Sequence, residues 1–169
     1  HLTLTINKNL NINNFNSFLD YLKQKKEINA GVTGSLGEKI NIQFQEMTGL
    51  NIQHIKYKSQ PEQAIALLKN EVDYIITDHN TSGNENFVRL LTSADDRIYK
   101  NIPTFKEFNY NINSFGFAMI VIPNKNNLDV ANISKELNNP EHIKFASQVG
   151  WFLSKDNVIE FLKSERSKL

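Results

Sequence analysis

The chain has 169 residues, enough for one medium-sized domain with a hydrophobic core that needs no metal or disulfide to hold it together. Its 19 basic and 18 acidic residues nearly cancel, which argues against a polyanion such as nucleic acid as a partner. Cysteine is absent and no apolar run approaches the ~20 residues of a membrane span, so neither a disulfide framework nor a membrane helix is expected. A cysteine-free chain fits a reducing cytosol and a bacterial periplasm equally well.

The first half of the chain alternates segments of strand character with segments of helical character. Strands are predicted at Leu2–Ile6, Ile28–Val32, Ile52–Tyr57 and Val72–Thr77. Three helices are predicted. The first follows Asn13-Asn14 and has Phe15, Phe18, Leu19 and Leu22 on its apolar face, and the second ends before Gly49 and has Ile40, Phe44 and Met47 on its apolar face. The third follows the capping box Ser59–Glu62 and has a buried face formed by Ala64, Ile65, Leu67 and Leu68.

The second half is less regular. We predict polar turns at Asp78–Asn84, a strand at Phe87–Leu91, a short helix at Pro103–Phe108, a buried strand at Phe115–Ile122, and helices that open at Asn139–Glu141 and at Ser154–Asn157.

This alternation predicts an α/β fold, with a mostly parallel sheet and helices on both of its faces. The segments Ile28–Val32, Ile52–Tyr57 and Val72–Thr77 should be adjacent parallel strands. Ligands of such sheets bind beyond the carboxyl ends of the strands. Two loops leave the sheet there, one at Thr33-Gly34-Ser35 and one at Thr77-Asp78-His79, and we expect them to lie side by side.

The segment Ala30–Glu38 leads from a strand through a Gly/Ser/Thr loop into a helix, and such a helix start offers free N–H groups to a carboxylate or phosphate. Alternatively, the glycines only permit a tight turn. The spacing matches neither a P-loop nor a dinucleotide fingerprint. Thr33 and Ser35 could donate hydroxyls to a ligand, or Ser35 could simply cap the helix. Asp78 could line the site or form an Asx turn.

Catalytic and metal sites are not predicted. Ser35 or Ser82 could be combined with His79 and Asp78 into a triad, but no nucleophile-elbow pattern is present. Adjacent side chains on an extended segment also point apart. The four histidines lack the paired spacing of a zinc site, so no metal or other cofactor is expected, and the chain is not expected to be an enzyme.

Several short motifs occur in an order typical of one family. They are Gly34-Ser35, Met47-Thr48-Gly49, Lys56-Tyr57-Lys58, Leu67-Leu68, Val72-Asp73-Tyr74 running to Asp78, Leu91-Thr92-Ser93, Arg97, Ile102-Pro103-Thr104 with Glu107, Phe115-Gly116 and Ile122-Pro123. In this order the chain resembles the extracytoplasmic substrate-binding proteins of the tripartite tricarboxylate transporter system (Bug/TctC-like), nearly from end to end.

The resemblance implies a type II periplasmic-binding-protein fold, a periplasmic location in a bacterium, a small carboxylate ligand and a membrane transporter as partner. It places the ligand at Thr33, Gly34, Ser35, Asp78 and His79. It also implies that residues 1–123 form the second, ligand-binding lobe and that 124–169 are helices which pack on a first lobe that this chain lacks. We therefore expect weak ligand binding, and self-association through the apolar stripes of those helices.

Three residues depart from the family pattern at the expected site. Val32 replaces a glycine, while Gly37 and Glu38 replace a serine and a histidine. A carboxylate at Glu38 repels an anionic ligand, so either Glu38 points away or the ligand class has changed. The alternative function is a lobe that no longer binds a ligand and serves as an interaction or scaffold module.

Overall fold

The computed structural model describes residues 1–94, 96–97, 99–112, 139–141 and 144. The chain divides into two compact units, residues 1–119 and 120–169, and nearly all described residues belong to the first. The predicted division into 1–123 and 124–169 stays a prediction, as do the strand Phe115–Ile122 and the last helix, which lie outside the described residues.

The described elements of the first unit are β1 (Thr3–Asn7), η1 (Lys8–Leu10), α1 (Phe15–Gln24), β2 (Ile28–Val32), α2 (Gly34–Thr48), β3 (Ile52–Lys56), α3 (Gln60–Leu68), β4 (Tyr74–Thr77), α4 (His79–Ser82), β5 (Phe87–Thr92) and η2 (Phe105–Phe108), of which η1 and η2 are 3-10 turns. In the second unit, residues 140, 141 and 144 are helical. The predicted helix start there is confirmed, because the Asn139 side chain accepts the Glu141 N–H at 3.0 Å.

The five described strands form one mixed sheet in the order β3-β2-β4-β1-β5. β2 lies parallel to both β3 and β4, which confirms the predicted trio of adjacent parallel strands. β1 runs antiparallel to its two neighbours, β4 and β5. The carboxyl ends of β2, β3, β4 and β5 therefore share one edge of the sheet with the start of β1.

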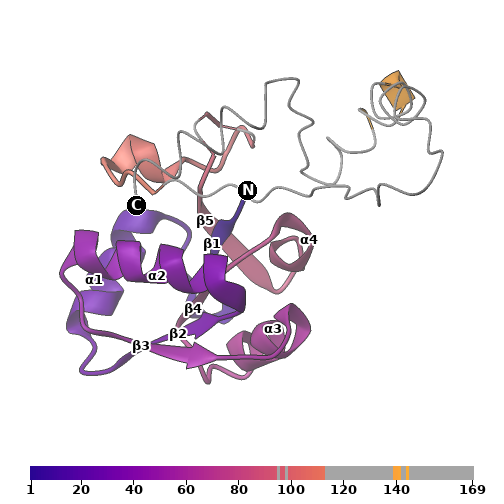
Figure 1. Cartoon of the computed structure of the whole chain (residues 1–169). Helices are drawn as coiled ribbons and strands as arrows, with labels where there is room; N and C mark the ends of the chain where they lie inside the picture. Colours follow the sequence, from indigo (N-terminus) through magenta and orange to yellow (C-terminus); the bar gives the residue numbers. More distant parts are fainter. Residues whose placement is uncertain (95, 98, 113–138, 142–143, 145–169) are drawn as a thin grey trace, which may run out of the picture. The chain divides into compact units, whose positions relative to one another are not determined.

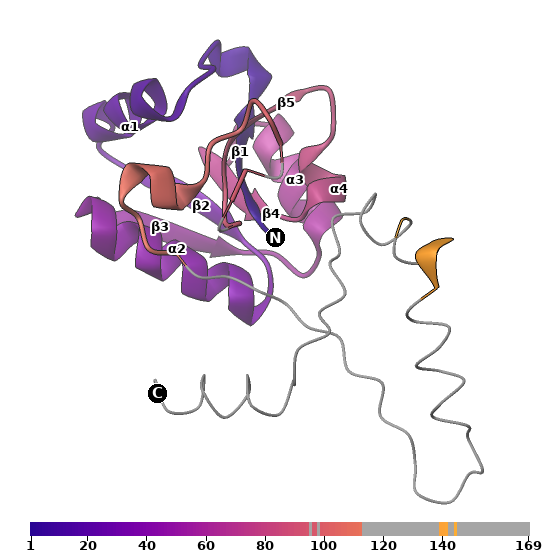
Figure 2. The ribbon, with the colours of Figure 1, turned by 90° about the horizontal axis from the view of Figure 1, so that it is seen from above.

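Helices cover both faces of the sheet, as predicted (Figure 1). α1 and α2 bury Phe15, Phe18, Ile40 and Phe44 in the larger hydrophobic cluster, on one face. α3 contributes Ala66 and Leu67 to a smaller cluster with Val72, Ile75 and Phe87 on the other face. α4 contacts α3, β1 and β5 on that same side. The view from above shows the two helix layers from a second direction (Figure 2).

The helix starts follow local capping chemistry. Asn14 accepts the Ser17 N–H at 2.9 Å to begin α1, and Ser59 accepts the Glu62 N–H at 3.4 Å to begin α3. The capping box predicted at Ser59 is only half formed, because the Glu62 carboxylate accepts the N–H of Lys58 instead. α2 ends as predicted at Gly49, which adopts φ 67°.

The prediction of which face of α3 is buried is wrong, because the observed buried face is rotated about the helix axis by a fraction of a turn. Ile65 is 50% exposed and Leu68 is 38% exposed, whereas Gln63, Ala66 and Leu67 are buried. The Gln63 side chain explains the difference, because its Nε2 donates to the Gly31 carbonyl of β2 at 2.7 Å and turns this polar residue inward. On α2, Ile40 and Phe44 are buried as predicted, but Met47 is 39% exposed.

Two predicted connections contain short helical turns. The segment predicted as polar turns, Asp78–Asn84, includes the single-turn helix α4, which the Asp78 side chain caps. The helix predicted at Pro103–Phe108 is the 3-10 turn η2, which a complete Thr104–Glu107 capping box initiates. The predicted strand Phe87–Leu91 is confirmed as β5. Among the described residues no helix has the length and apolar character of a membrane span.

Candidate functional site

The predicted site residues lie at the carboxyl edge of the sheet. Gly31 of β2 is opposite Ile75 of β4, so Thr33 and Thr77, two residues further along each parallel strand, reach the edge on the same face. The register thus brings the Thr33 and Asp78 segments to neighbouring positions. Their convergence on one ligand stays a prediction.

Helix α2 begins with a first turn that lacks side-chain capping. Thr33 is the extended N-cap residue, yet its side chain makes no capping hydrogen bond, and the first turn holds no acidic residue. Gly34 follows with φ 67°, a conformation that favours glycine. The alternative in which Ser35 caps the helix is wrong, because Ser35 lies within the first turn and is exposed. This 15-residue helix directs the positive end of its dipole toward the edge.

Buried threonines line the same edge. Thr3 of β1 is opposite Thr77 of β4 and Thr92 of β5, and all three residues are at most 1% exposed. The hydroxyl oxygens of Thr77 and Thr33 are buried and have no hydrogen-bond partner within the described part of the chain. Because buried polar groups are normally paired, two unpaired hydroxyls at one sheet edge mark a place where a bound molecule could supply the missing partner. The sequence analysis placed Thr77 in a loop at this edge but, unlike Thr33, did not count it among the ligand-binding residues.

Asp78 is a half-buried residue whose side chain bonds the backbone at the start of α4. Its Oδ1 accepts the N–H of Thr81, three residues further along the chain, at 2.9 Å, so the side chain caps the start of α4 and does not form the predicted Asx turn, which would reach only two residues further. Backbone atoms of His79 begin α4, while its side chain lies outside what the structure describes.

The Glu38 carboxylate turns toward β3. Its Oε1 lies 2.8 Å from the Nζ of Lys56, which is opposite Val32 in the β2–β3 register. The ion pair is exposed, with the Glu38 side chain 37% and the Lys56 side chain 68% accessible. This ion pair compensates the charge of Glu38. The two alternatives for Glu38, that it points away from a ligand or that the ligand class has changed, both stay predictions. Sequence spacing could not reveal this pair, because the two residues lie on different elements.

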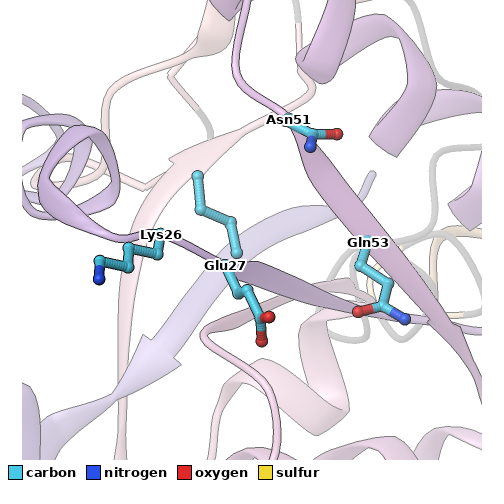
Figure 3. A pocket seen from close by; sticks show the side chains of 5 residues that line it. Lys26, Glu27, Asn51 and Gln53 are labelled. Carbon is cyan, nitrogen blue, oxygen red and sulfur yellow. The ribbon is translucent and has the colours of Figure 1, made fainter.

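The opposite, amino edge of the sheet carries a shallow depression lined by Lys26, Glu27, Ile28, Asn51 and Gln53 (Figure 3). Figure 3 shows Lys26 and Glu27 on the segment that enters β2, with Gln53 on the neighbouring strand β3. The depression combines opposite charges and amides without a convergent polar group. It is unrelated to the predicted site residues. Among the described residues, no group of three or more histidine, aspartate or glutamate side chains is arranged to hold a metal ion.

Comparison with solved structures assigns the fold. The R. palustris protein Rpa4515, solved with adipate, matches 98% of this chain with a TM-score of 0.77 and 16% identity. MatC from Rhodopseudomonas palustris, with bound malate, matches 67% with a TM-score of 0.60 and 14% identity. The periplasmic binding protein BugD matches 64% with a TM-score of 0.57 and 20% identity. The sequence itself matches no family model and none of the curated proteins.

The chain therefore has the fold of Bug- and TctC-like periplasmic binding proteins, as the sequence resemblance implied. It spans 60% of the length of Rpa4515, 42% of MatC and 40% of BugD. At 14–20% identity the likeness concerns the fold, and the ligand and partners of this chain have to be argued from its own residues.

Proposed function

We propose that this chain is an extracytoplasmic solute-binding protein, or a single lobe of one, which binds a small carboxylate in the periplasm and serves a tripartite tricarboxylate-type transporter. One observation carries the proposal: the uncapped start of α2 and the unpaired buried hydroxyls of Thr33 and Thr77 occur together at one sheet edge. A carboxylate satisfies both features, because it accepts hydrogen bonds from N–H and O–H donors and is favoured by the helix dipole.

The comparisons support the same chemistry. Rpa4515 was solved with adipate and MatC with malate, which are both small dicarboxylates. BugD is a periplasmic binding protein, and a binding protein needs complementarity and hydrogen-bond donors but no activated nucleophile. We therefore propose binding without catalysis. The site residues proposed are Thr33, Gly34, Ser35, Asp78 and His79, and we add Thr77 because its buried hydroxyl has no partner among the described residues.

The decisive variant is Thr77→Val, which replaces the unpaired hydroxyl by a methyl group of similar shape. Without ligand we expect it to raise the free energy of unfolding by about 1 kcal/mol, because a buried unpaired hydroxyl is removed. With adipate or malate we expect about tenfold weaker binding, which corresponds to one lost hydrogen bond. Calorimetry and thermal unfolding measure the two effects on the same samples.

The matched control is Thr48→Val, at the far end of α2. The Thr48 hydroxyl donates to the Phe44 carbonyl at 2.7 Å, so its loss should leave ligand affinity unchanged. Binding that is equally strong in wild type and Thr77→Val would remove Thr77 from the site. A panel of small carboxylates that fails to stabilise the wild-type chain at all would favour the alternative function, a scaffold or interaction module.

A further inference from the structure

The outward face of α3 presents two adjacent apolar side chains to solvent. Among the described residues, four large apolar side chains are exposed: Ile42 (43%) and Met47 (39%) on α2, and Ile65 (50%) and Leu68 (38%) on α3. Ile42 and Met47 are five positions apart, so they point in different directions from their helix. Ile65 and Leu68 are three positions apart and therefore share one face of α3.

This outward face has the residue spacing of a seam between two packed helices. Pro61 precedes Ile65 by four positions, Leu68 follows Ile65 by three, and all three residues are exposed. Apolar residues at alternating intervals of four and three positions are typical of helices that pack side by side. The exposed residues of α1, in contrast, are all polar. α3 therefore has one apolar face against the sheet and a second one in solvent.

Opposite charges stand beside the two ends of this seam. Glu62 lies in the first turn of α3, and Lys69 follows its last residue with a backbone that is still helical. The two residues are seven positions apart, so they stand on the same side of the seam. Glu62 accepts the Lys58 N–H through Oε2 at 3.1 Å. Lys69 lies 3.9 Å from Glu71 in a pair whose side chains are 64% and 54% exposed, which leaves its amine accessible.

We propose that α3 is a surface through which two copies of this chain associate, with the two α3 helices antiparallel about a two-fold axis. In such a pair the same side of each seam faces itself in the reverse direction. Glu62 of one copy then lies opposite Lys69 of the second copy, and the symmetry repeats this contact beside Ile65 and Leu68. The charge pattern of the face is thus complementary to a second copy of itself. None of these residues belongs to the proposed ligand site, so the inference is independent of the proposed function.

The size of the face predicts weak association. α3 has nine residues, and a helix of that length extends over only about 14 Å. Two such helices bury less surface than the roughly 1,200–2,000 Å² of a stable protein–protein interface. We therefore expect a dissociation constant on the order of 100 μM for the dimer. Sedimentation equilibrium of the full chain from about 10 μM to about 1 mM measures this constant.

Charge reversal tests the antiparallel arrangement. Glu62→Lys alone and Lys69→Glu alone each place like charges opposite one another, and each should weaken association about fivefold. The double variant Glu62→Lys/Lys69→Glu restores opposite charges and should return the constant to within about twofold of the wild type. It shares with Glu62→Lys the loss of the Lys58 contact, so its recovery cannot come from better folding.

A second pair of variants tests the apolar centre. Ile65→Ser should weaken association about tenfold, because the symmetry removes two apolar side chains from the interface. Ile42→Ser, at a similarly exposed position on α2, is the matched control and should leave the constant unchanged. Circular dichroism melts verify that every variant folds.

Three results would overturn the proposal. A strict monomer at about 1 mM would leave the α3 face to a partner of another kind. Association that Ile65→Ser does not weaken would place the interface elsewhere on the chain. Failure of the double variant to recover would exclude the antiparallel arrangement. Weakening by Ile65→Ser, together with recovery in the double variant, would support the assignment directly.

Discussion

At the scale of single residues, the best-defined polar arrangement is at the amino edge of the sheet, opposite the proposed site. The Asp73 side chain is 7% exposed and forms an ion pair with Lys25. It also accepts the Tyr21 hydroxyl at 3.2 Å and the Asn29 N–H at 2.9 Å. One carboxylate thereby joins α1, β2 and β4, which fixes how the first helix lies on the sheet.

Asp73→Asn should therefore destabilise the fold. It leaves the Lys25 amine without its counter-charge, and we expect the free energy of unfolding to fall by about 2 kcal/mol, less than for a fully buried pair because Lys25 is a third exposed. Urea unfolding followed by circular dichroism measures the change.

The matched control is Asp20→Asn, which removes the exposed pair of Asp20 with Lys23 at 3.7 Å. A surface pair of this kind is worth less than about 0.5 kcal/mol. Similar losses in both variants would mean that the Asp73 contacts contribute no more than a surface pair.

At the scale of elements, the turn η2 is fixed by one glutamate with two roles. The Glu107 carboxylate accepts the Thr104 N–H at 3.0 Å to complete the capping box, and it forms a two-pronged ion pair with Arg97. Thr92 of β5 donates its N–H to the Pro103 carbonyl at 3.0 Å. The segment after β5 is thereby tied back to the edge of the sheet.

Hydrogen bonding by Arg97, followed by that of the Thr104 backbone, lowers the pKa of Glu107 to about 2. Because the pKa is lowered on folding, these contacts stabilise the fold above the usual pKa of 4.5, and their contribution is lost as the pH falls toward 2. In an NMR titration we expect Glu107 to titrate near pH 2 in the wild type and clearly higher in Arg97→Gln. An unchanged Glu107 titration in that variant would contradict the assigned pairing.

The elements also show which parts of the structure the sequence could predict. The limits of the helices could be predicted because the residues that cap them, Asn14, Ser59 and Gly49, bond to backbone groups only a few residues away. The buried face of α3 could not be predicted in this way, because Gln63 turns inward to bond Gly31, a residue 32 positions earlier in the chain. A Cβ at Gly31 would lie 2.9 Å from Ile75 and 3.2 Å from Gln63, and such close contacts are not visible in a sequence pattern.

The candidate site likewise contains residues that the sequence could predict and residues that it could not. Thr33 and Asp78 could be selected because each follows a predicted strand. Thr77 could be recognised only from the strand register, which places it opposite Thr3 in the sheet. The pairing of Glu38 could be recognised only from the position of Lys56 on another strand. Sequence analysis selected the edge where ligands bind in such folds, but it could not find the Glu38–Lys56 ion pair, whose two residues lie on different elements.

At the scale of the whole molecule, the described fold provides one surface of the proposed site. Binding sites usually enclose most of a small ligand, and a single edge leaves water to compete for each donor. The chain spans 60% or less of the three solved proteins it was compared with. We therefore propose that the remaining surface of the site comes from a part that these 169 residues do not include.

This proposal predicts weak binding by the chain on its own. We expect the dissociation constant of the preferred carboxylate to exceed about 10 μM, because fewer contacts must offset the full entropy cost of association. At a ligand concentration of one hundred times that constant, the fold should still gain about 2.7 kcal/mol of stability, so thermal unfolding detects even weak binding. Calorimetry then gives the constant itself. Submicromolar binding to the isolated chain would mean that the edge described here, with the rest of these 169 residues, already forms a complete site.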